Sequence, residues 1–241
     1  MRRKIKQLIN KLGWDLQRQN SLSSPRSEIL TVLDFIKADM VFDVGANIGQ
    51  FATDLFSSGY SGRIISFEPL TKAHKTLRLA ARNNPNWTVH SRTAIGDQDG
   101  EIEINISGNS VSSSALNMLD AHSSAAKDSA YIAKESSSII RLDKISKQYL
   151  GDESRLFIKI DTQGYEWQVL DGGFETLKVA VGIMLELSLV QLYEGQKLWK
   201  EIIERIESKG FTLWTIQRGF TDTRTARSLQ VDAIFIRNPD I

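Results

Sequence analysis

The sequence predicts an α/β fold built on a mostly parallel, doubly wound sheet of seven strands with helices on both faces. Apolar runs of strand length alternate along the chain with amphipathic helical stretches, the order expected for parallel strands joined by crossover helices. Several of these runs end in an acidic residue, and the carboxyl ends of parallel strands meet at one edge of a sheet. The last two runs have no helix between them, so we expect a C-terminal antiparallel hairpin.

The composition limits the class of protein. With 241 residues, of which 41% are hydrophobic, the chain is long enough to bury one complete core. It contains no apolar run of about 18 residues, so we expect no membrane-spanning helix. The absence of cysteine excludes a disulfide framework and a cysteine-based zinc site, and it favours a cytoplasmic location. A net charge of +1 argues against an extended nucleic-acid surface.

The first 20 residues have the pattern of a basic amphipathic helix. Six lysines and arginines alternate with apolar residues at steps of three and four, namely Ile5, Leu8, Ile9, Leu12 and Leu16. Such a helix contacts an anionic membrane surface or a membrane-bound partner, or it packs on the domain as an ordinary terminal helix. For a cytoplasmic protein the membrane surface would be that of the inner membrane. We assign residues 1–24 to this helix and a linker, and residues 25–241 to the main domain.

The main domain begins with a helix at Ser24 and Pro25, a capping residue followed by proline at the first helical position. The first strand follows at 40–44, and glycine, proline and asparagine residues set the ends of most later elements. Further helices are predicted at 48–58, 71–83, 165–170 and 197–209, and strands at 64–68, 87–91, 101–106, 156–160, 181–187, 211–217 and 231–237.

The segment 107–138 differs from the rest of the domain, because 11 of its 32 residues are serine. It is long for a structureless loop inside a compact domain, and long loops of this kind are often lids or binding loops. A disordered insertion is the alternative. We favour a lid over the substrate, since the segment leaves the sheet after the third strand and returns before the fourth.

The strongest functional signal is the stretch from Asp43 to Gly49, where an apolar strand ends in a D-x-G-x-x-x-G turn before a helix. Such a turn lets backbone approach a ligand closely. Glu68 lies 23 positions after Gly45, near the spacing at which an acid binds a nucleotide ribose. Asn47 stands where a dinucleotide site needs its second glycine, which argues against a nicotinamide cofactor. The pattern therefore favours S-adenosylmethionine, which has an adenosine but no pyrophosphate.

This interpretation gives each residue of the turn a role toward the methyl donor. Asp43 would hold the ammonium group of the donor, directly or through water, and Glu68 would accept from the ribose hydroxyls. Ala94 and Ile95 would form an apolar wall for adenine, with Asp97 reaching its amino group. The backbone of the turn would line the donor at Gly45, Ala46, Asn47 and Gly49.

A second cluster, Asp161-Thr162-Gln163-Gly164, follows the strand at 156–160. Asp161 would act as a general base or orient the acceptor hydroxyl; the alternative is a purely structural helix cap. Enzymes that methylate the amines of nucleic-acid bases usually have an Asn-Pro-Pro-like turn here, so an oxygen acceptor is favoured. His122 is a second catalytic candidate that could swing over the acceptor. Asp161 and Glu186 could hold a metal ion, but no ligand spacing demands one, so we predict none.

Across residues 38–237 the sequence resembles the FkbM family of S-adenosylmethionine-dependent methyltransferases. The resemblance rests on the blocks at 42–49, 67–69, 94–97, 141–143, 158–166, 185–188 and 229–235, of which the I-K-I-D…G-x-E block is the most specific. Gln163 departs from the family pattern, where glutamate is common. The resemblance implies a Rossmann-like class I methyltransferase fold and O-methylation of a hydroxyl on a sugar, glycolipid or secondary metabolite. The alternatives are a nicotinamide-dependent oxidoreductase and a non-catalytic scaffold with the same fold.

Overall fold

The computed structural model describes Lys11 and residues 24–237 of the chain. The predicted amphipathic helix of residues 1–20 therefore lies almost wholly outside the described residues. The described domain opens with α2, Pro25–Phe35, and the hydroxyl of Ser24 accepts a hydrogen bond from the backbone N–H of Ser27 at 3.3 Å. The predicted cap and the proline at the first helical position are both confirmed.

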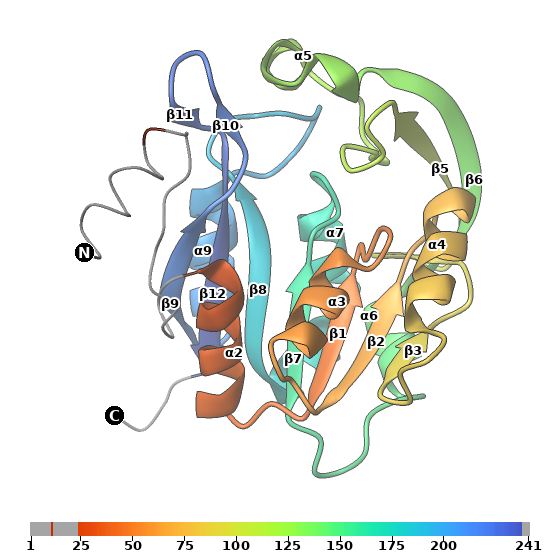
Figure 1. The fold of residues 1–241 in the computed structure, drawn as a ribbon, viewed down its shortest axis with the longest axis vertical. Coiled ribbons are helices and arrows are strands. Elements are labelled where there is room, and N and C mark those ends of the chain that lie inside the picture. Colours follow the sequence, from red (N-terminus) through yellow and green to blue (C-terminus); the bar gives the residue numbers. More distant parts are fainter. Residues whose placement is uncertain (1–10, 12–23, 238–241) are drawn as a thin grey trace.

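The central sheet has seven strands, as predicted, in the order β3-β2-β1-β7-β8-β12-β9 (Figure 1). The first five strands run parallel to one another, and β12 runs antiparallel to both β8 and β9. The C-terminal hairpin is thus confirmed, with β12 inside the sheet and β9 at its edge. The strands are β1 (Met40–Val44), β2 (Arg63–Phe67), β3 (Trp87–Val89), β7 (Leu156–Ile160), β8 (Ala180–Ser188), β9 (Phe211–Arg218) and β12 (Gln230–Arg237).

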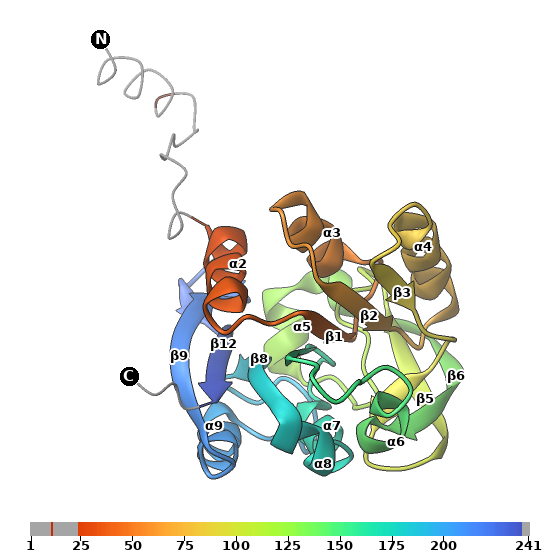
Figure 2. The ribbon, with the colours of Figure 1, turned by 90° about the horizontal axis from the view of Figure 1, so that it is seen from below.

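Helices cover both faces of the sheet (Figure 2). One face carries α2, α3 (Gln50–Ser57) and α4 (Thr71–Ala81), and the other carries α6 (Leu142–Ser146), α7 (Glu166–Asp171), α8 (Phe174–Val179) and α9 (Trp199–Glu207). The sequence predicted the longer helices, but α6 and α8 have only five and six residues, too few to establish a helical period.

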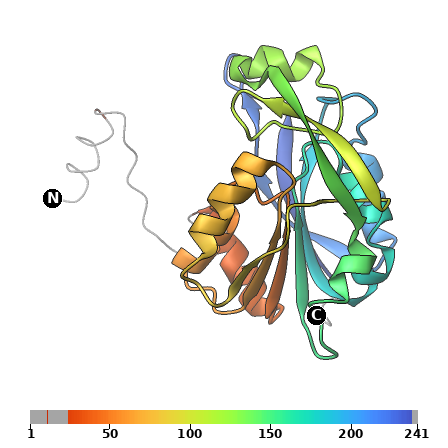
Figure 3. The same cartoon turned by 90° about the vertical axis from the view of Figure 1, so that its right-hand side faces the viewer.

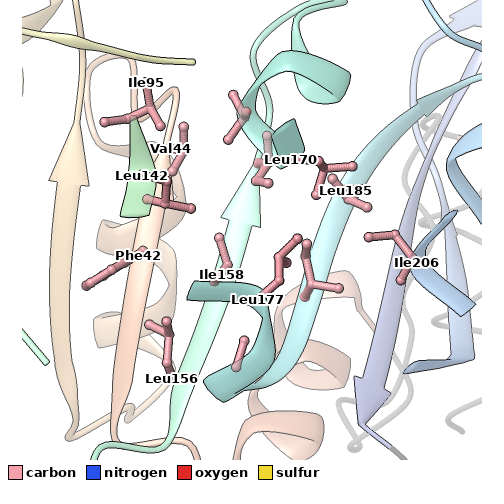
Figure 4. Close-up of a cluster of buried hydrophobic side chains, with 14 of the residues drawn as sticks. Phe42, Val44, Ile95, Leu142, Leu156, Ile158, Leu170, Leu177, Leu185 and Ile206 are labelled. Atoms are coloured by element: carbon pink, nitrogen blue, oxygen red, sulfur yellow. The ribbon is translucent and has the colours of Figure 1, made fainter. Parts of the chain in front are cut away.

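Each face of the sheet has its own hydrophobic cluster because successive strand residues point to opposite sides. Val41 packs under α2 and α3, whereas Phe42 and Ile158 belong to the cluster on the other face (Figure 4). Phe42 and Ile158 are completely buried, and burial of such a side chain stabilises the fold by about 1.5–3 kcal/mol. The two clusters fix the sheet, and with it the positions of the strand ends.

A second, three-stranded sheet projects beyond the carboxyl edge of the central sheet (Figure 3). It contains β4 (Ala94–Gly96), β5 (Gly100–Ser107) and β6 (Tyr131–Arg141), with α5 (Asp120–Ala125) and a 3-10 turn, Lys127–Ser129, between β5 and β6. We call residues 100–141 the arm. The strand predicted at 101–106 is therefore correct, but it belongs to this second sheet. The serine-rich segment 107–138 is also more regular than predicted, since β6 begins at Tyr131.

The arm is attached to the loop 189–196 that follows β8. The backbone N–H of Leu119 donates to the carbonyl of Leu192 at 2.9 Å, and the N–H of Glu194 donates to Asn117 at 2.8 Å. Leu116 and Met118 pack against the buried side chains of a small hydrophobic cluster that includes Leu192. This contact holds the arm beside the strand ends.

Among the described residues, no helix is both long enough and apolar enough to span a bilayer.

Candidate active site

A cavity of about 500 Å³ lies at the carboxyl ends of the central strands, within the size range of small-molecule sites. One wall is the turn after β1 together with the residues that end β2. A second wall is formed by the ends of β7 and β8 and the start of β12. The arm forms the third, through residues 109–115 and His122. Segments that lie far apart in the sequence thus surround one cavity.

The glycine turn after β1 packs directly against the turn after β7. Gly45 has a φ of +77°, and a Cβ built there would lie 1.9 Å from the backbone oxygen of Asp161. The N–H groups of Gly45 and Ala46 both donate to the carbonyl of Phe67, at 3.1 and 3.0 Å. Only glycine fits at position 45, because the position requires both a left-handed backbone and the absence of a side chain.

Gly49, the second glycine of the pattern, has a different role. It precedes α3 with a φ of +92°, and a Cβ there would lie 2.8 Å from the ring of Trp87. Gly49 is not among the residues that line the cavity, whereas Gly45, Ala46 and Asn47 are. Gly49 therefore allows the helix to pack closely instead of contacting a ligand.

Glu68 lies in the cavity wall and is only 5% exposed. Its Oε2 accepts from the N–H of Asn47 and its Oε1 from the N–H of Leu70, both at 2.8 Å. Burial raises the pKa of Glu68 to about 7, against the opposing effect of these two hydrogen bonds. Each oxygen keeps a second lone pair, so the carboxylate can still accept from a ligand.

The predicted apolar wall is in place, because Ala94 and Ile95 line the cavity together with Phe67 and Leu70. Asp97 lies at the exposed surface after β4 and is not among the lining residues. The structure therefore does not bring Asp97 to the part of the cavity where it was predicted to contact adenine.

Asp43 differs from its predicted position, since its side chain is completely buried and does not line the cavity. Its Oδ1 lies 3.2 Å from Nζ of Lys159, and its Oδ2 accepts from the hydroxyl of Ser66 at 3.3 Å. The structure therefore does not bring the Asp43 carboxylate to the cavity wall for the direct contact with the ammonium group of a donor that was predicted, and a contact through water stays a prediction. The carboxylate instead positions Lys159, whose ammonium group also donates to the carbonyl of Gly45 at 3.2 Å.

Lys159 connects the two turns electrostatically. Burial by itself would lower the pKa of Lys159, but the charges of Asp43 and Asp161 outweigh burial and hold the pKa above its ordinary value. The lysine is therefore a permanent cation at neutral pH. Its Nζ lies 3.5 Å from Oδ2 of Asp161, so the two side chains lie on the same side of the chain at the end of β7.

Asp161 lines the cavity, and its side chain is 37% exposed. The alternative that it caps a helix is wrong, because α7 begins only at Glu166 and has no side-chain cap. Glu166 stabilises the turn instead: its Oε1 accepts from the N–H groups of Thr162 at 2.9 Å and Gly164 at 3.2 Å. The Asp161 carboxylate is thus available to a ligand.

His122 lies on α5 in the arm and lines the cavity, although it is only 2% exposed. Its ring contacts those of Tyr193 and Phe220 at centroid distances of 5.2 Å, and its Nε2 lies 3.2 Å from the hydroxyl of Ser112. Burial lowers the pKa of His122 to about 4. The imidazole is therefore neutral at physiological pH and a weaker base than an ordinary histidine.

Asp232 and Gln230 were not predicted as site residues, and Glu186 was considered only as a possible metal ligand. Glu186 ends up next to Asp232 of β12, which pairs with it across the two antiparallel strands. Gln230, two residues before Asp232 in β12, also lines the cavity. The prediction considered only the carboxyl ends of strands, whereas β12 runs in reverse and brings its amino end to the site. The predicted hairpin, together with an aspartate inside an apolar run, is the signal that could have identified Asp232.

Comparison with known proteins gives one family and a set of structures. The profile of the methyltransferase FkbM domain matches residues 43–213, more than half of the chain. No curated protein matches the sequence.

The solved structures similar to this chain include the methyltransferase domain of bacterial CtHen1-CN, with 11% identity, a TM-score of 0.49, and coverage of 90% of this chain and 100% of that one. A putative rRNA methylase from Clostridium thermocellum has 12% identity and a TM-score of 0.48 over 92% of this chain and 100% of that one. The fibrillarin of Aeropyrum pernix, crystallised with natively bound S-adenosyl-L-methionine, has 10% identity and a TM-score of 0.46 over 83% of this chain and 66% of that one.

Proposed function

The chain belongs to the methyltransferase FkbM family, and we propose that it transfers the methyl group of S-adenosylmethionine to a hydroxyl oxygen of a sugar, glycolipid or secondary metabolite. The observation that carries the proposal is the partly exposed Asp161 carboxylate, held between Lys159 and Gln163 at the end of β7. It faces the same cavity as the glycine turn and Glu68.

The first wall of the cavity fits the adenosine of the donor. Glu68 has acceptor capacity left for the ribose hydroxyls, and Ala94 and Ile95 provide an apolar surface for the base. The buried Oδ1 of Asn47 has no hydrogen-bond partner within the described part of the chain, so a polar group of a ligand would satisfy it. When bound, the donor supplies a methyl group on a positively charged sulfur.

The second wall supplies what an oxygen acceptor needs. A hydroxyl group must lose its proton during transfer, and a carboxylate within hydrogen-bond reach can accept it, which contributes about 10²–10⁴-fold to the rate. Asp161 would be that carboxylate, because it lines the cavity with its side chain partly exposed. The arm closes the third side, and orientation of the reactants there supplies much of the remaining acceleration.

The proposal is tested by supplying S-adenosylmethionine labelled with ¹³C in its methyl group, with the glycolipid and polysaccharide fractions of cells that lack the protein. We expect a new O-methyl carbon signal to grow together with S-adenosylhomocysteine, and the same product to be found in cells that contain the protein. An N-methyl or S-methyl product would contradict an oxygen acceptor. Donor binding without any transfer to either fraction would contradict a sugar or glycolipid acceptor.

Glu68→Gln tests the ribose assignment. We expect it to weaken S-adenosylhomocysteine binding by about 1.5–3 kcal/mol, the range for a hydrogen bond to a charged group. In the unaltered protein, hydroxyl donors favour the ionised carboxylate, so the affinity should rise as the pH rises through about 7, the raised pKa of Glu68. Calorimetry at several pH values measures both effects.

The exposed Glu101 provides a matched control, since Glu101→Gln makes the same change outside the cavity. The melting temperature of each variant shows whether the turn held by Glu68 has survived. If folded Glu68→Gln binds as tightly as the unaltered protein and with the same pH dependence, Glu68 does not contact the donor.

The basic segment of residues 1–20 gives a separate prediction, because a glycolipid acceptor would be at a membrane. Binding of the full chain to anionic lipid vesicles should weaken as salt is added, since ions screen exposed charges. Vesicle sedimentation at several salt concentrations measures this. If a chain that begins at residue 21 binds the vesicles equally well, the segment has no role in membrane contact.

A further inference from the structure

The turn between β7 and α7 holds Gln163 in a backbone conformation that glutamine rarely adopts. Gln163 has a φ of +54°, and Gly164 follows with a φ of +98°. Neighbouring groups fix this shape: Glu166 accepts from the N–H groups on both sides of Gln163, and the hydroxyl of Ser114 in the arm donates to the Gln163 carbonyl at 2.6 Å. Left-handed residues of this kind cluster at functional sites, where the surroundings hold them in place.

The side-chain amide of Gln163 connects two carboxylates of the cavity. Its Nε2 donates to Oδ1 of Asp161 at 3.0 Å and to Oε2 of Glu186 at 2.7 Å. Its Oε1 accepts from the hydroxyl of Tyr193 at 2.8 Å. The opposite orientation of the amide would place a carbonyl oxygen against two carboxylates and an NH₂ group against a hydroxyl proton. The network therefore determines the orientation.

Tyr193 is completely buried and comes from the loop to which the arm is attached. Its ring fills the space beside Gly164, where an added Cβ would lie 2.9 Å from Cδ2 of the ring. The single hydroxyl proton has two acceptors in range, Gln163 Oε1 at 2.8 Å and the carbonyl of Ser112 at 3.3 Å, and the nearer one is the amide. Tyr193 thus fixes which end of the amide faces the carboxylates.

Glu186 is the second carboxylate of the pair, and Gln230 also donates to its Oε2, at 2.7 Å. Burial, and then the charges of Asp161, Asp232 and Glu166, raise the pKa of Glu186 well above its ordinary value, while Lys159 acts in the opposite direction. No hydrogen bond within the described part of the chain reaches the other oxygen, Oε1. Glu186 lines the cavity, so this oxygen remains for a ligand.

We propose that Gln163 is a positioning residue of the transfer reaction: its amide, oriented by Tyr193, holds Asp161 toward the reacting hydroxyl and Glu186 toward a second polar group of the acceptor. This inference rests on the proposed function. In this role Gln163 acts through the two carboxylates, to which its Nε2 donates. Its contribution therefore belongs to the acceptor side of the site and not to the donor side.

Gln163→Met tests the proposal, because it keeps the length of the side chain but removes both N–H donors and the oxygen that accepts from Tyr193. We expect kcat to fall at least tenfold and the acidic limb of its pH profile to move upward by at least one pH unit, with S-adenosylhomocysteine affinity within twofold. Tyr193→Phe should act in the same direction with a smaller effect. Gln148→Met, on the exposed surface, is the matched control.

A second measurement needs no acceptor. The carboxyl carbon of Glu186 is followed by ¹³C NMR as the pH is changed, and we expect it to titrate at a higher pH in Gln163→Met and in Tyr193→Phe than in the unaltered protein. An unchanged titration, or a loss of activity matched by equal losses of donor affinity and melting temperature, would show that Gln163 is merely structural. If the unaltered protein fails to bind S-adenosylhomocysteine, the proposed function fails instead.

Discussion

Asp161→Asn should lower kcat by about 10²–10⁴-fold, the usual contribution of a general base, while donor affinity and melting temperature stay nearly unchanged. The amide has almost the same size as the carboxylate, and Asp161 does not cap α7, so the substitution tests the charge with little structural cost. The loss should fall on kcat because the proton leaves the hydroxyl only in the transition state. Initial rates with the acceptor fraction, together with calorimetry, separate the two quantities.

Asp152→Asn is the matched control, since Asp152 is exposed just before β7, at the opposite end of that strand from Asp161. It should leave kcat unchanged. Turnover of Asp161→Asn within about threefold of the unaltered protein, far below the usual effect of a general base, would exclude Asp161 from proton transfer. Of the two catalytic residues predicted from the sequence, His122 would then be left, despite the low pKa that its burial produces.

Gly45→Ala should abolish donor binding and strongly destabilise the domain. An added Cβ would lie 1.9 Å from the backbone oxygen of Asp161, and the φ of +77° is strained for alanine. The strain alone costs about 1–2 kcal/mol. The clash cannot be relieved by a side-chain rotation, because its partner is backbone, so the two turns must separate. Thermal unfolding and S-adenosylhomocysteine calorimetry measure the two consequences.

Gly59→Ala separates strain from clash, because Gly59 has a φ of +103° but no atom within 4 Å of its built Cβ. The strain should lower the free energy of unfolding by about 1–2 kcal/mol, and donor binding should be kept. If Gly45→Ala is no more destabilising than Gly59→Ala and binds the donor normally, the close contact between the two turns is not required.

The central sheet could be predicted because its strands are buried on both faces, which makes them continuous apolar runs such as Leu156–Ile160. The strand β6 could not be predicted in this way, because it is mostly exposed and contains several serines. Its pairing with β5 and β4 holds it in place. Its conformation depends on partners that are distant in sequence. The helix α5 is likewise too short to show a period.

The site was predictable where a motif fixes the backbone, as at Gly45 and Glu68, and less so where partners decide the direction of a side chain. Asp43 was expected to face the donor. It pairs instead with the buried Lys159, which lies two residues before Asp161. Alternation along a strand puts Lys159 on the same side as Asp161, but it cannot indicate that Lys159 also pairs with Asp43 of the neighbouring strand. Tyr193 had no local signal, because its loop reaches the site only through packing against the arm.

The most direct test is a pair of calorimetric titrations of the full chain, one with S-adenosylhomocysteine and one with NAD. A methyl donor site built on the turn at Gly45 and on Glu68 should bind S-adenosylhomocysteine at one site per chain, and the binding should be lost in Gly45→Ala. NAD should give no binding heat, because Asn47 occupies the position where a pyrophosphate needs glycine. Binding of NAD with no binding of S-adenosylhomocysteine would contradict the assignment of this cavity to a methyl donor.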